Sequence, residues 1–224
     1  MAKTTRRNSL ALFALSPLAA WGLGDESGKA PAPRQHWMQI SPREQIRRRY
    51  FPDILLLTQD RKEVSFYQDL VKDKLVLINF MYTSCDRICP RVTQNLAKVQ
   101  RLLGSRMGHD IFFYSFTLDP THDTPEVLKD YAKAHGVGPG WSFLTGPTGQ
   151  MEMLRKRLGF TDPDPELDKD RESHIGNVRY GNEARLLWGA CPGMSRAEFI
   201  VESLSWIDWP QAKSRHKPEV TERN

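Results

Sequence analysis

Continuous apolar segments of this chain alternate with segments in which apolar residues recur every three or four positions. Residues 74–81 and 111–118 are apolar runs of strand length, typical of central strands that are covered on both faces. Between these runs, apolar residues recur at helical spacing and Gly104 ends the series: Val92, Leu96, Val99 and Leu103. The pattern predicts a strand–helix–strand core of an α/β domain.

Shorter elements are expected on either side of this core. Before it, residues 53–58 and 63–66 flank a turn-like segment and predict an N-terminal β-hairpin. After it, Thr124-Pro125-Glu126 offers a helix cap, a proline for the first turn and an early acid. We therefore expect a helix that runs from this point to about His135.

The C-terminal part predicts a polar loop, a hairpin and a last helix. Residues 161–172 are acidic and contain proline, so we expect a surface loop there, and Gly181-Asn182 predicts the turn of the hairpin. Strands alternating with helices indicate a central mixed β-sheet flanked by helices. The remaining expected elements are a strand over residues 141–145, a helix over 150–158, hairpin strands over 177–180 and 183–188, and a helix over 195–206.

The N-terminal segment predicts export from the cytoplasm. Lys3, Arg6 and Arg7 precede a short apolar stretch, Leu10 to Leu23, whose length suits a signal peptide better than a membrane span. The paired arginines resemble a twin-arginine signal, and an ordinary secretory signal is the alternative. We expect a periplasmic protein that contacts the membrane only if this segment stays uncleaved.

The expected organisation places one domain between flexible ends. Prolines and polar residues after the signal indicate a linker, and the charged C-terminus indicates a polar tail. The segments are a signal peptide over residues 1–24, a linker over 25–48, the domain over 49–209 and the tail over 210–224.

Net charge gives little support to nucleic-acid binding. The 224 residues include 32 Lys and Arg against 27 Asp and Glu, a formal net charge of +5. Three of these positive charges lie in the expected signal peptide. The basic run 47–49 is interpreted as a solvated helix end or linker, and no larger basic stripe remains. Nucleic acid is therefore not an expected partner.

Two of the three cysteines carry the clearest candidate chemistry. Cys85 and Cys89 follow the first central strand and lie at the expected start of a helix. Unpaired backbone N–H groups and the helix dipole favour thiolates at such a position. A lowered thiol pKa serves both thiol–disulfide exchange and ligation of a soft ion such as Cu(I). A redox site, a soft-metal site and a buried pair without a task remain open.

The residues around the cysteines resemble a known family. Residues 80–90, Phe-Met-Tyr-Thr-Ser-Cys-Asp-Arg-Ile-Cys-Pro, are similar to the core motif of the Sco/SenC family, whose members assemble the copper site of cytochrome oxidase in the periplasm or mitochondrion. Residues 117–126, Thr-Leu-Asp-Pro-Thr-His-Asp-Thr-Pro-Glu, are similar to its second signature. The likeness covers about residues 50–160 and implies a thioredoxin-like fold.

This resemblance implies a copper centre. Cys85, Cys89 and a downstream histidine would hold one copper ion per chain, as Cu(I) or Cu(II), and His174 is the candidate histidine. Asp119 is expected to be a nearby acid that orients a ligand or tunes a thiol pKa; as a structural residue it would only shape the turn before Pro120.

The chain departs from the usual family pattern after His174. Residues 175–184 replace the apolar strand and turn that typical members have, which puts the standard oxidase role in question. Cys191 is expected to be a passive buried residue. A resolving thiol or a further soft ligand is the alternative for this cysteine.

These residues predict a copper chaperone more than a turnover enzyme. The chaperone would deliver copper to a respiratory oxidase subunit or another cuproprotein. The alternative is a thiol–disulfide oxidoreductase, supplied by a thioredoxin-like reductant, in which Cys85 attacks and Cys89 resolves without an obligatory metal. An interaction module without chemistry is disfavoured by the intact cysteine pair.

Overall fold

The computed structural model describes residues 40–169 and 176–208 of the chain. They lie in one compact unit that begins at Ile40. Their strands and helices, in chain order, are α1 (Pro42–Tyr50), β1 (Leu55–Thr58), β2 (Glu63–Ser65), the π-helix η1 (Phe66–Val71), β3 (Leu75–Met81), α2 (Ile88–Leu103), the 3₁₀ turn η2 (Gly104–Arg106), β4 (Ile111–Thr117), α3 (Pro125–Ala134), β5 (Trp141–Thr145), α4 (Thr148–Arg157), α5 (Pro165–Lys169), β6 (Asn177–Asn182), the 3₁₀ turn η4 (Glu183–Arg185), β7 (Leu187–Pro192) and α6 (Ala197–Ile207).

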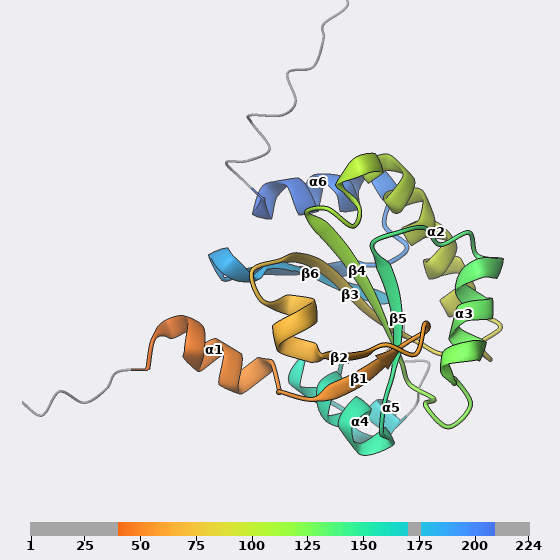
Figure 1. Ribbon diagram of the computed structural model, residues 1–224, viewed down its shortest axis with the longest axis horizontal. Coiled ribbons are helices and arrows are strands. Elements are labelled where there is room, and N and C mark those ends of the chain that lie inside the picture. Colours follow the sequence, from red (N-terminus) through yellow and green to blue (C-terminus); the bar gives the residue numbers. More distant parts are fainter. Residues whose placement is uncertain (1–39, 170–175, 209–224) are drawn as a thin grey trace, which may run out of the picture. The chain divides into compact units, whose positions relative to one another are not determined.

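The strands of the described residues form one mixed sheet in the order β2-β1-β5-β4-β3-β6-β7 (Figure 1). Strand β3 is central, because it pairs with β4 in parallel and with β6 in antiparallel orientation. Strands β1 and β2 form the expected N-terminal hairpin. The predicted mixed α/β sheet with flanking helices is confirmed.

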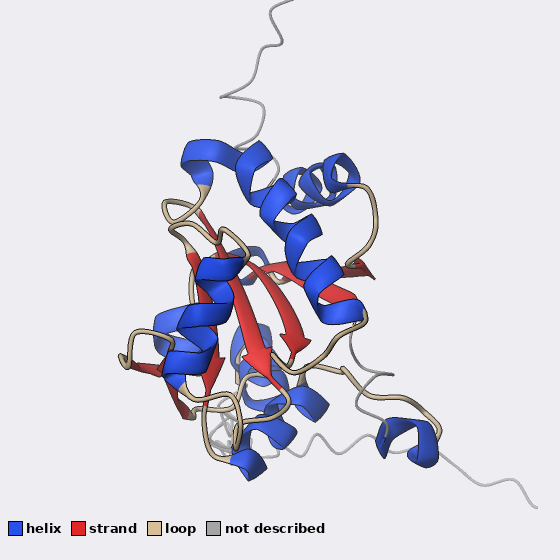
Figure 2. Ribbon diagram, turned by 90° about the vertical axis from the view of Figure 1, so that its right-hand side faces the viewer, coloured by secondary structure: helices blue, strands red, loops and turns tan. Residues whose placement is uncertain are grey.

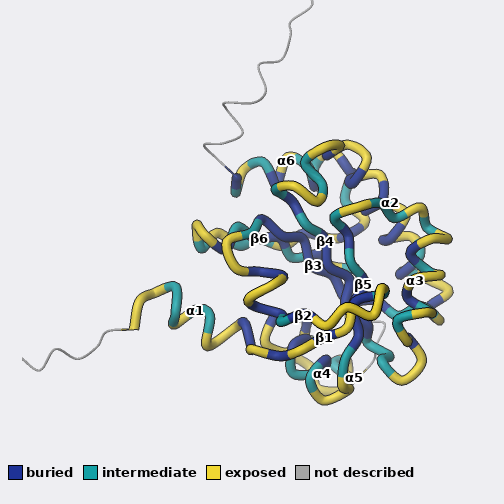
Figure 3. The backbone as a smooth tube through the Cα atoms, in the orientation of Figure 1, coloured by how far each residue is buried: buried dark blue, intermediate teal, exposed yellow. Residues whose placement is uncertain are grey.

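Helices cover both faces of this sheet (Figure 2). Helices α2, α3 and α6 pack on one face against Leu77 and Met81 of β3. On the other face, η1 and α4 pack against Ile78 and Phe80 of the same strand. Every residue of β3 is buried, and Figure 3 shows this buried centre beneath exposed helix surfaces. The double cover explains why the strand is a continuous apolar run instead of an alternating one.

Two predicted helix ends are confirmed in detail. Helix α2 ends at Gly104, whose φ of 55° lies in the left-handed region that favours glycine. Helix α3 begins after Thr124, whose side-chain oxygen accepts a hydrogen bond from the Val127 N–H at 3.4 Å. These ends position the loops that carry the motif residues.

Helix α1 corrects the expected linker. Residues 42–50 are helical, whereas we expected a linker as far as residue 48. Ser41 caps this helix by accepting a hydrogen bond from the Glu44 N–H at 3.2 Å, and Pro42 occupies the first turn. Proline is favoured there because that N–H has no partner within the helix, so Pro42 starts a helix instead of breaking one. The basic run 47–49 forms its last turn.

The terminal hairpin is confirmed, but its turn lies further along the chain than predicted. Strand β6 continues through Gly181 and Asn182, and the chain reverses over residues 183–186. Gly181 is needed inside the strand, since a Cβ there would meet the Trp188 ring of β7 at 2.0 Å. In this chain the Gly181-Asn182 pair therefore marks the close approach of the Trp188 side chain and not a turn.

The polar segment 161–172 also differs from its prediction. It contains the short helix α5, which we did not expect. The carboxylate of Asp168 accepts two hydrogen bonds from the buried Arg155 of α4, both at 2.9 Å. This bidentate pair holds the acidic segment against α4.

Several predicted segments lie outside the described residues. These are the signal peptide, the linker up to residue 39, His174 and the tail over 210–224. No helix within residues 40–169 or 176–208 is long and apolar enough to span a bilayer.

Candidate metal and thiol site

The loop between β3 and α2 carries the two motif cysteines. Strand β3 ends at Met81 and α2 begins at Ile88, so Cys85 lies in the loop and Cys89 in the first helical turn. We expected both cysteines at the start of the helix; Cys85 instead precedes the helix, and its N–H donates to the Tyr82 carbonyl at 3.3 Å. Both thiols are buried, and neither is in a disulfide.

Backbone N–H groups at the start of α2 point at Cys85. Burial alone would raise the pKa of the Cys85 thiol. Hydrogen bonds from the N–H groups of Cys89, Arg87 and Ile88, together with the Cys89 thiol, outweigh that effect, so the pKa of Cys85 falls below its ordinary value. The start of a helix thus stabilises a thiolate at Cys85, as the sequence predicts.

Cys89 lies in the opposite electrostatic setting. Burial is the main reason that the pKa of the Cys89 thiol rises well above its ordinary value, and the neighbouring Cys85 and Asp123 raise it further. Only the backbone near Tyr82 acts in the other direction. The pair therefore combines two buried thiols whose pKa values are shifted in opposite directions, that of Cys85 down and that of Cys89 up.

Asp123 is the buried acid that braces the cysteine loop. Its carboxylate accepts hydrogen bonds from the Thr83 N–H, at 3.1 Å to Oδ2, and from the hydroxyls of Thr83 and Thr117. The His122 Nδ1 atom lies 3.0 Å from its Oδ1. Asp123 thus joins the start of α3 to the loop that carries Cys85.

Sequence reasoning named Asp119 and missed Asp123. The Asp119 carboxylate accepts a hydrogen bond from the Thr121 hydroxyl at 2.8 Å, and the backbone N–H of Asp119 donates to Thr117 Oγ1 at 2.8 Å. These contacts shape the turn after β4, while the proposed action of Asp119 on a thiol or ligand stays a prediction. One sequence signal could have identified Asp123: it directly precedes the Thr124 cap and lies shortly after the end of strand β4, beside the cysteine loop.

Cys191 lies in β7 opposite Val178 of β6. It is buried and belongs to the same apolar cluster as Cys85 and Cys89. Burial raises the pKa of the Cys191 thiol, and a hydrogen bond with Ser195 offsets part of that rise. The expected burial of Cys191 is confirmed, and its passive role stays a prediction.

The candidate ligand His174 lies outside the described residues. The site geometry therefore includes Cys85 and Cys89 but no distance from either cysteine to His174. Within residues 40–169 and 176–208, no three His, Cys, Asp or Glu side chains gather as a metal site. The described part of the site therefore consists of the two thiols, the helix start and Asp123.

A free cysteine pair at the carboxyl end of a central strand, followed at once by a helix, defines a thioredoxin-like thiol protein. The family model described as SCO1/SenC matches residues 54–203 of this chain. The chain belongs to the SCO1/SenC family.

Known relatives and a solved structure agree with this assignment. The chain is 35% identical over 89 residues to the "SCO1 protein homolog" of Bacillus subtilis, covering 39% of this chain and 45% of the relative. It is 29% identical over 134 residues to a "Putative copper-binding protein" of Stutzerimonas stutzeri, covering 59% and 64%. The chain thus spans only about half the length of the relatives it matches. The crystal structure of yeast Sco1 with copper bound superposes with a TM-score of 0.55 at 20% identity, covering 75% of this chain and 96% of that one, which confirms the thioredoxin-like fold.

Proposed function

We propose that this protein binds one copper ion through Cys85, Cys89 and His174 and transfers it to a cuproprotein such as a respiratory oxidase subunit. The observation that carries the proposal is the free cysteine pair at the start of α2. Membership of the SCO1/SenC family supports it, and so does the name of the Stutzerimonas relative. The role of His174 rests on the family resemblance.

The donor set fits a soft metal ion. Two thiolates and one neutral imidazole suit Cu(I), and in a more tetragonal arrangement they suit Cu(II). Cys85 is prepared for this role by its lowered thiol pKa, whereas Cys89 must lose its proton when the metal enters. Copper binding should therefore release protons and weaken as the pH falls.

A copper titration of the reduced chain tests the proposal. We expect one bound copper per chain, followed by optical spectra for Cu(II) and by competition with a chromophoric chelator for Cu(I). Cys85→Ser, Cys89→Ser and His174→Ala should each weaken binding by more than the roughly 10–100-fold that losing an outer-shell partner costs.

Two matched variants serve as controls. His109 is an exposed histidine beside Asp110, and Cys191 is a buried cysteine in β7, so His109→Ala and Cys191→Ser should leave copper affinity unchanged. Full affinity in His174→Ala would remove that residue from the ligand set. Full affinity in both Cys85→Ser and Cys89→Ser would overturn the copper proposal.

The unequal thiol pair also supports a second candidate function, thiol–disulfide exchange. The Cys85 thiolate would attack a disulfide of the partner and form a mixed disulfide, and Cys89 would then displace the partner thiolate. The partner gains two electrons, and this chain is left with a Cys85–Cys89 disulfide. A thioredoxin-like reductant would restore the two thiols.

The reduction potential of the pair separates the two functions. An equilibrium with a glutathione or dithiothreitol couple, followed by mass spectrometry, measures it. A potential near that of known disulfide reductants would favour exchange. A disulfide too stable for periplasmic reductants would exclude turnover as a disulfide reductase. Fractionation of cells that express the full chain would test the proposed periplasmic location.

A further inference from the structure

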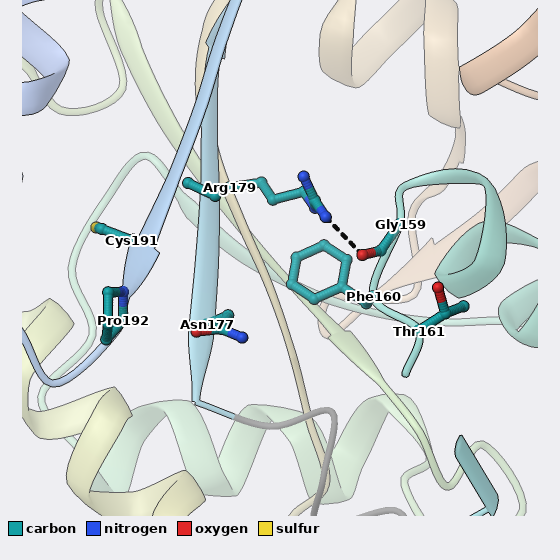
Figure 4. A pocket seen from close by; sticks show the side chains of 8 residues that line it. Gly159, Phe160, Thr161, Asn177, Arg179, Cys191 and Pro192 are labelled. Atoms are coloured by element: carbon teal, nitrogen blue, oxygen red, sulfur yellow. Dashed lines mark hydrogen bonds between the residues drawn. The ribbon is translucent and has the colours of Figure 1, made fainter. Parts of the chain in front are cut away.

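The sheet face opposite α2 contains an apolar pocket that neither copper binding nor thiol exchange uses. Its volume is about 490 Å³, within the usual range for small-molecule sites. Its walls come from α1, the end of α4, and strands β6 and β7, and include Phe51, Phe160, Trp188, Arg157 and Arg179. A second pocket of about 290 Å³ shares Gly159, Phe160, Arg179 and Ala190 with it (Figure 4).

Arg179 lines both pockets and is the main polar group of their shared wall. Its Nη2 donates to the Gly159 carbonyl, and its guanidinium lies 5.2 Å from the centre of the Phe160 ring (Figure 4). Its Nε is buried and has no hydrogen-bond acceptor in the described part of the chain. Burial lowers the pKa of this guanidinium, and no carboxylate of the described residues acts in the other direction.

The neighbouring Arg155 shows what a satisfied buried arginine looks like in this fold. Arg155 is 4% exposed, and Glu152 and Asp168 supply two oxygens each to its guanidinium. Arg179 has no such ion pair among residues 40–169 and 176–208. A positive charge thus borders an apolar pocket without a counter-ion from the described chain.

Trp188 supplies a second unsatisfied donor to the same pocket. Its indole Nε1 is buried without an acceptor among the described residues, and its ring lies 5.0 Å from that of Phe51. Buried donors without partners are rare in native proteins, because each one has lost its bonds to water. Arg179 and Trp188 therefore mark a place where an acceptor is missing.

We propose that this pocket binds a small amphipathic carboxylate. The carboxylate pairs with the guanidinium of Arg179 and accepts from the Trp188 indole, and the alkyl body lies against Phe51 and Phe160. Charge complementarity favours an anion, and the apolar walls favour an alkyl chain over a fully polar anion. This site is independent of the copper proposal and does not include either motif cysteine.

Calorimetric titration of the full, reduced chain with octanoate tests the proposal. We expect one octanoate per chain. Octanol lacks the charge and should bind at least about tenfold more weakly, since a hydrogen bond to a charged group contributes that much. Acetate keeps the charge but lacks the alkyl chain, whose burial is lost, so it should also bind at least about tenfold more weakly.

Three variants locate the site. Arg179→Gln should weaken octanoate binding at least about tenfold. Arg101→Gln is the matched control: Arg101 is an exposed arginine of α2 that lines neither pocket, so the change should be less than about threefold. Ala190→Phe leaves Arg179 in place and adds a bulky ring to the wall that the two pockets share. It should abolish binding, and it tests the site even if Arg179→Gln folds poorly.

The outcomes decide the matter in either direction. Tight octanoate binding that Arg179→Gln and Ala190→Phe remove, and that Arg101→Gln retains, establishes the site. Absence of octanoate binding to the unmodified chain overturns the proposal. It is equally overturned if octanol binds as tightly as octanoate, or if folded Arg179→Gln retains full affinity. Copper stoichiometry, measured in parallel, should not change in any of these variants.

Discussion

The two ends of strand β3 are built in similar ways but serve different purposes. Before the strand, the buried carboxylate of Glu183 accepts hydrogen bonds from the Asp73 N–H, the Tyr67 hydroxyl and Arg43. After the strand, the buried carboxylate of Asp123 accepts from the Thr83 N–H and two threonine hydroxyls. At each end, an acid from a distant part of the chain holds the segment next to β3.

The ends differ in what remains unpaired. Glu183 has a permanent cation, Arg43 of α1, besides the Tyr67 hydroxyl and the Asp73 N–H. Asp123 has the titratable His122 in place of a lysine or arginine among the described residues, and two free thiols lie in the adjoining loop and helix. The comparison teaches that the contacts before β3 stabilise the fold, whereas the loop and helix after β3 keep two thiols available for reaction.

The largest effect on this comparison should come from Arg43→Ala. It removes the cation from a carboxylate that is 1% exposed, so the free energy of unfolding should fall by about 3 kcal/mol, at the lower limit for a broken buried pair because Arg43 itself is partly exposed. Urea denaturation measures the change. Arg49→Ala removes an exposed arginine that lies over Tyr50, and should cost less than about 0.5 kcal/mol. Equal losses in both variants would contradict the special role of this pair.

The same ion pair should make stability depend on pH. Burial opposes ionisation of Glu183, but Arg43, the Asp73 N–H and Tyr67 outweigh it and lower its pKa below 4.5. A lowered pKa in the folded state adds stability above the unfolded-state pKa, and this stability is lost as the pH falls through the folded-state pKa. The difference in free energy of unfolding between the native chain and Glu183→Gln should therefore be full near pH 7 and shrink below about pH 4.5. A difference that stays constant down to pH 2 would rule out this linkage.

At the other end of β3, Asp123→Asn should have a smaller effect on stability. The change keeps the shape but removes the charge from several hydrogen bonds, so we expect a loss of about 2 kcal/mol in urea denaturation. Asp119→Asn, at a partly exposed turn, should cost less than about 1 kcal/mol. If Asp119→Asn proved the more costly change, the brace of the cysteine loop would have to be assigned to Asp119.

The smallest expected effect is a difference in thiol reactivity. The lowered pKa of Cys85 predicts that iodoacetamide modifies Cys85 first, with a midpoint below the ordinary thiol value of about 8.5. In Cys85→Ser, the remaining Cys89 and Cys191 should react slowly at pH 8, because burial raises the pKa of both thiols. Peptide mass spectrometry over a pH series measures each site. Modification of Cys89 as fast as Cys85 would contradict the proposed asymmetry.

Much of the fold could be predicted because its signals are local. Apolar runs predicted β3 and β4, and the cap formed by Thr124 and Pro125 predicted the start of α3. Helix α1 was not predicted although its signal is local too, because prolines and polar residues are typical both of linkers and of helix starts. The turn predicted at Gly181 was wrong for another reason. The close approach of the Trp188 ring from the next strand requires a glycine there, and no local sequence pattern shows that contact.

The candidate site was predictable to a similar degree. The cysteine spacing and its place after a strand indicated Cys85 and Cys89, and the helix start that lowers the Cys85 pKa follows from the same pattern. Asp123 was missed because its contact with Thr83 joins segments that are 40 residues apart. Arg179 was missed because its lack of a counter-ion depends on everything packed around it.

The sequence by itself determined that a central strand delivers two thiols to the start of a helix, since apolar period, capping residues and cysteine spacing are properties of neighbouring residues. Only the tertiary structure decided that the pKa of Cys85 is lowered while that of Cys89 is raised, that Asp123 braces their loop, and that Arg179 borders a pocket without a counter-ion among the described residues. Thiol pKa values, burial and pairing depend on which distant segments surround a group, and folding alone brings those segments together.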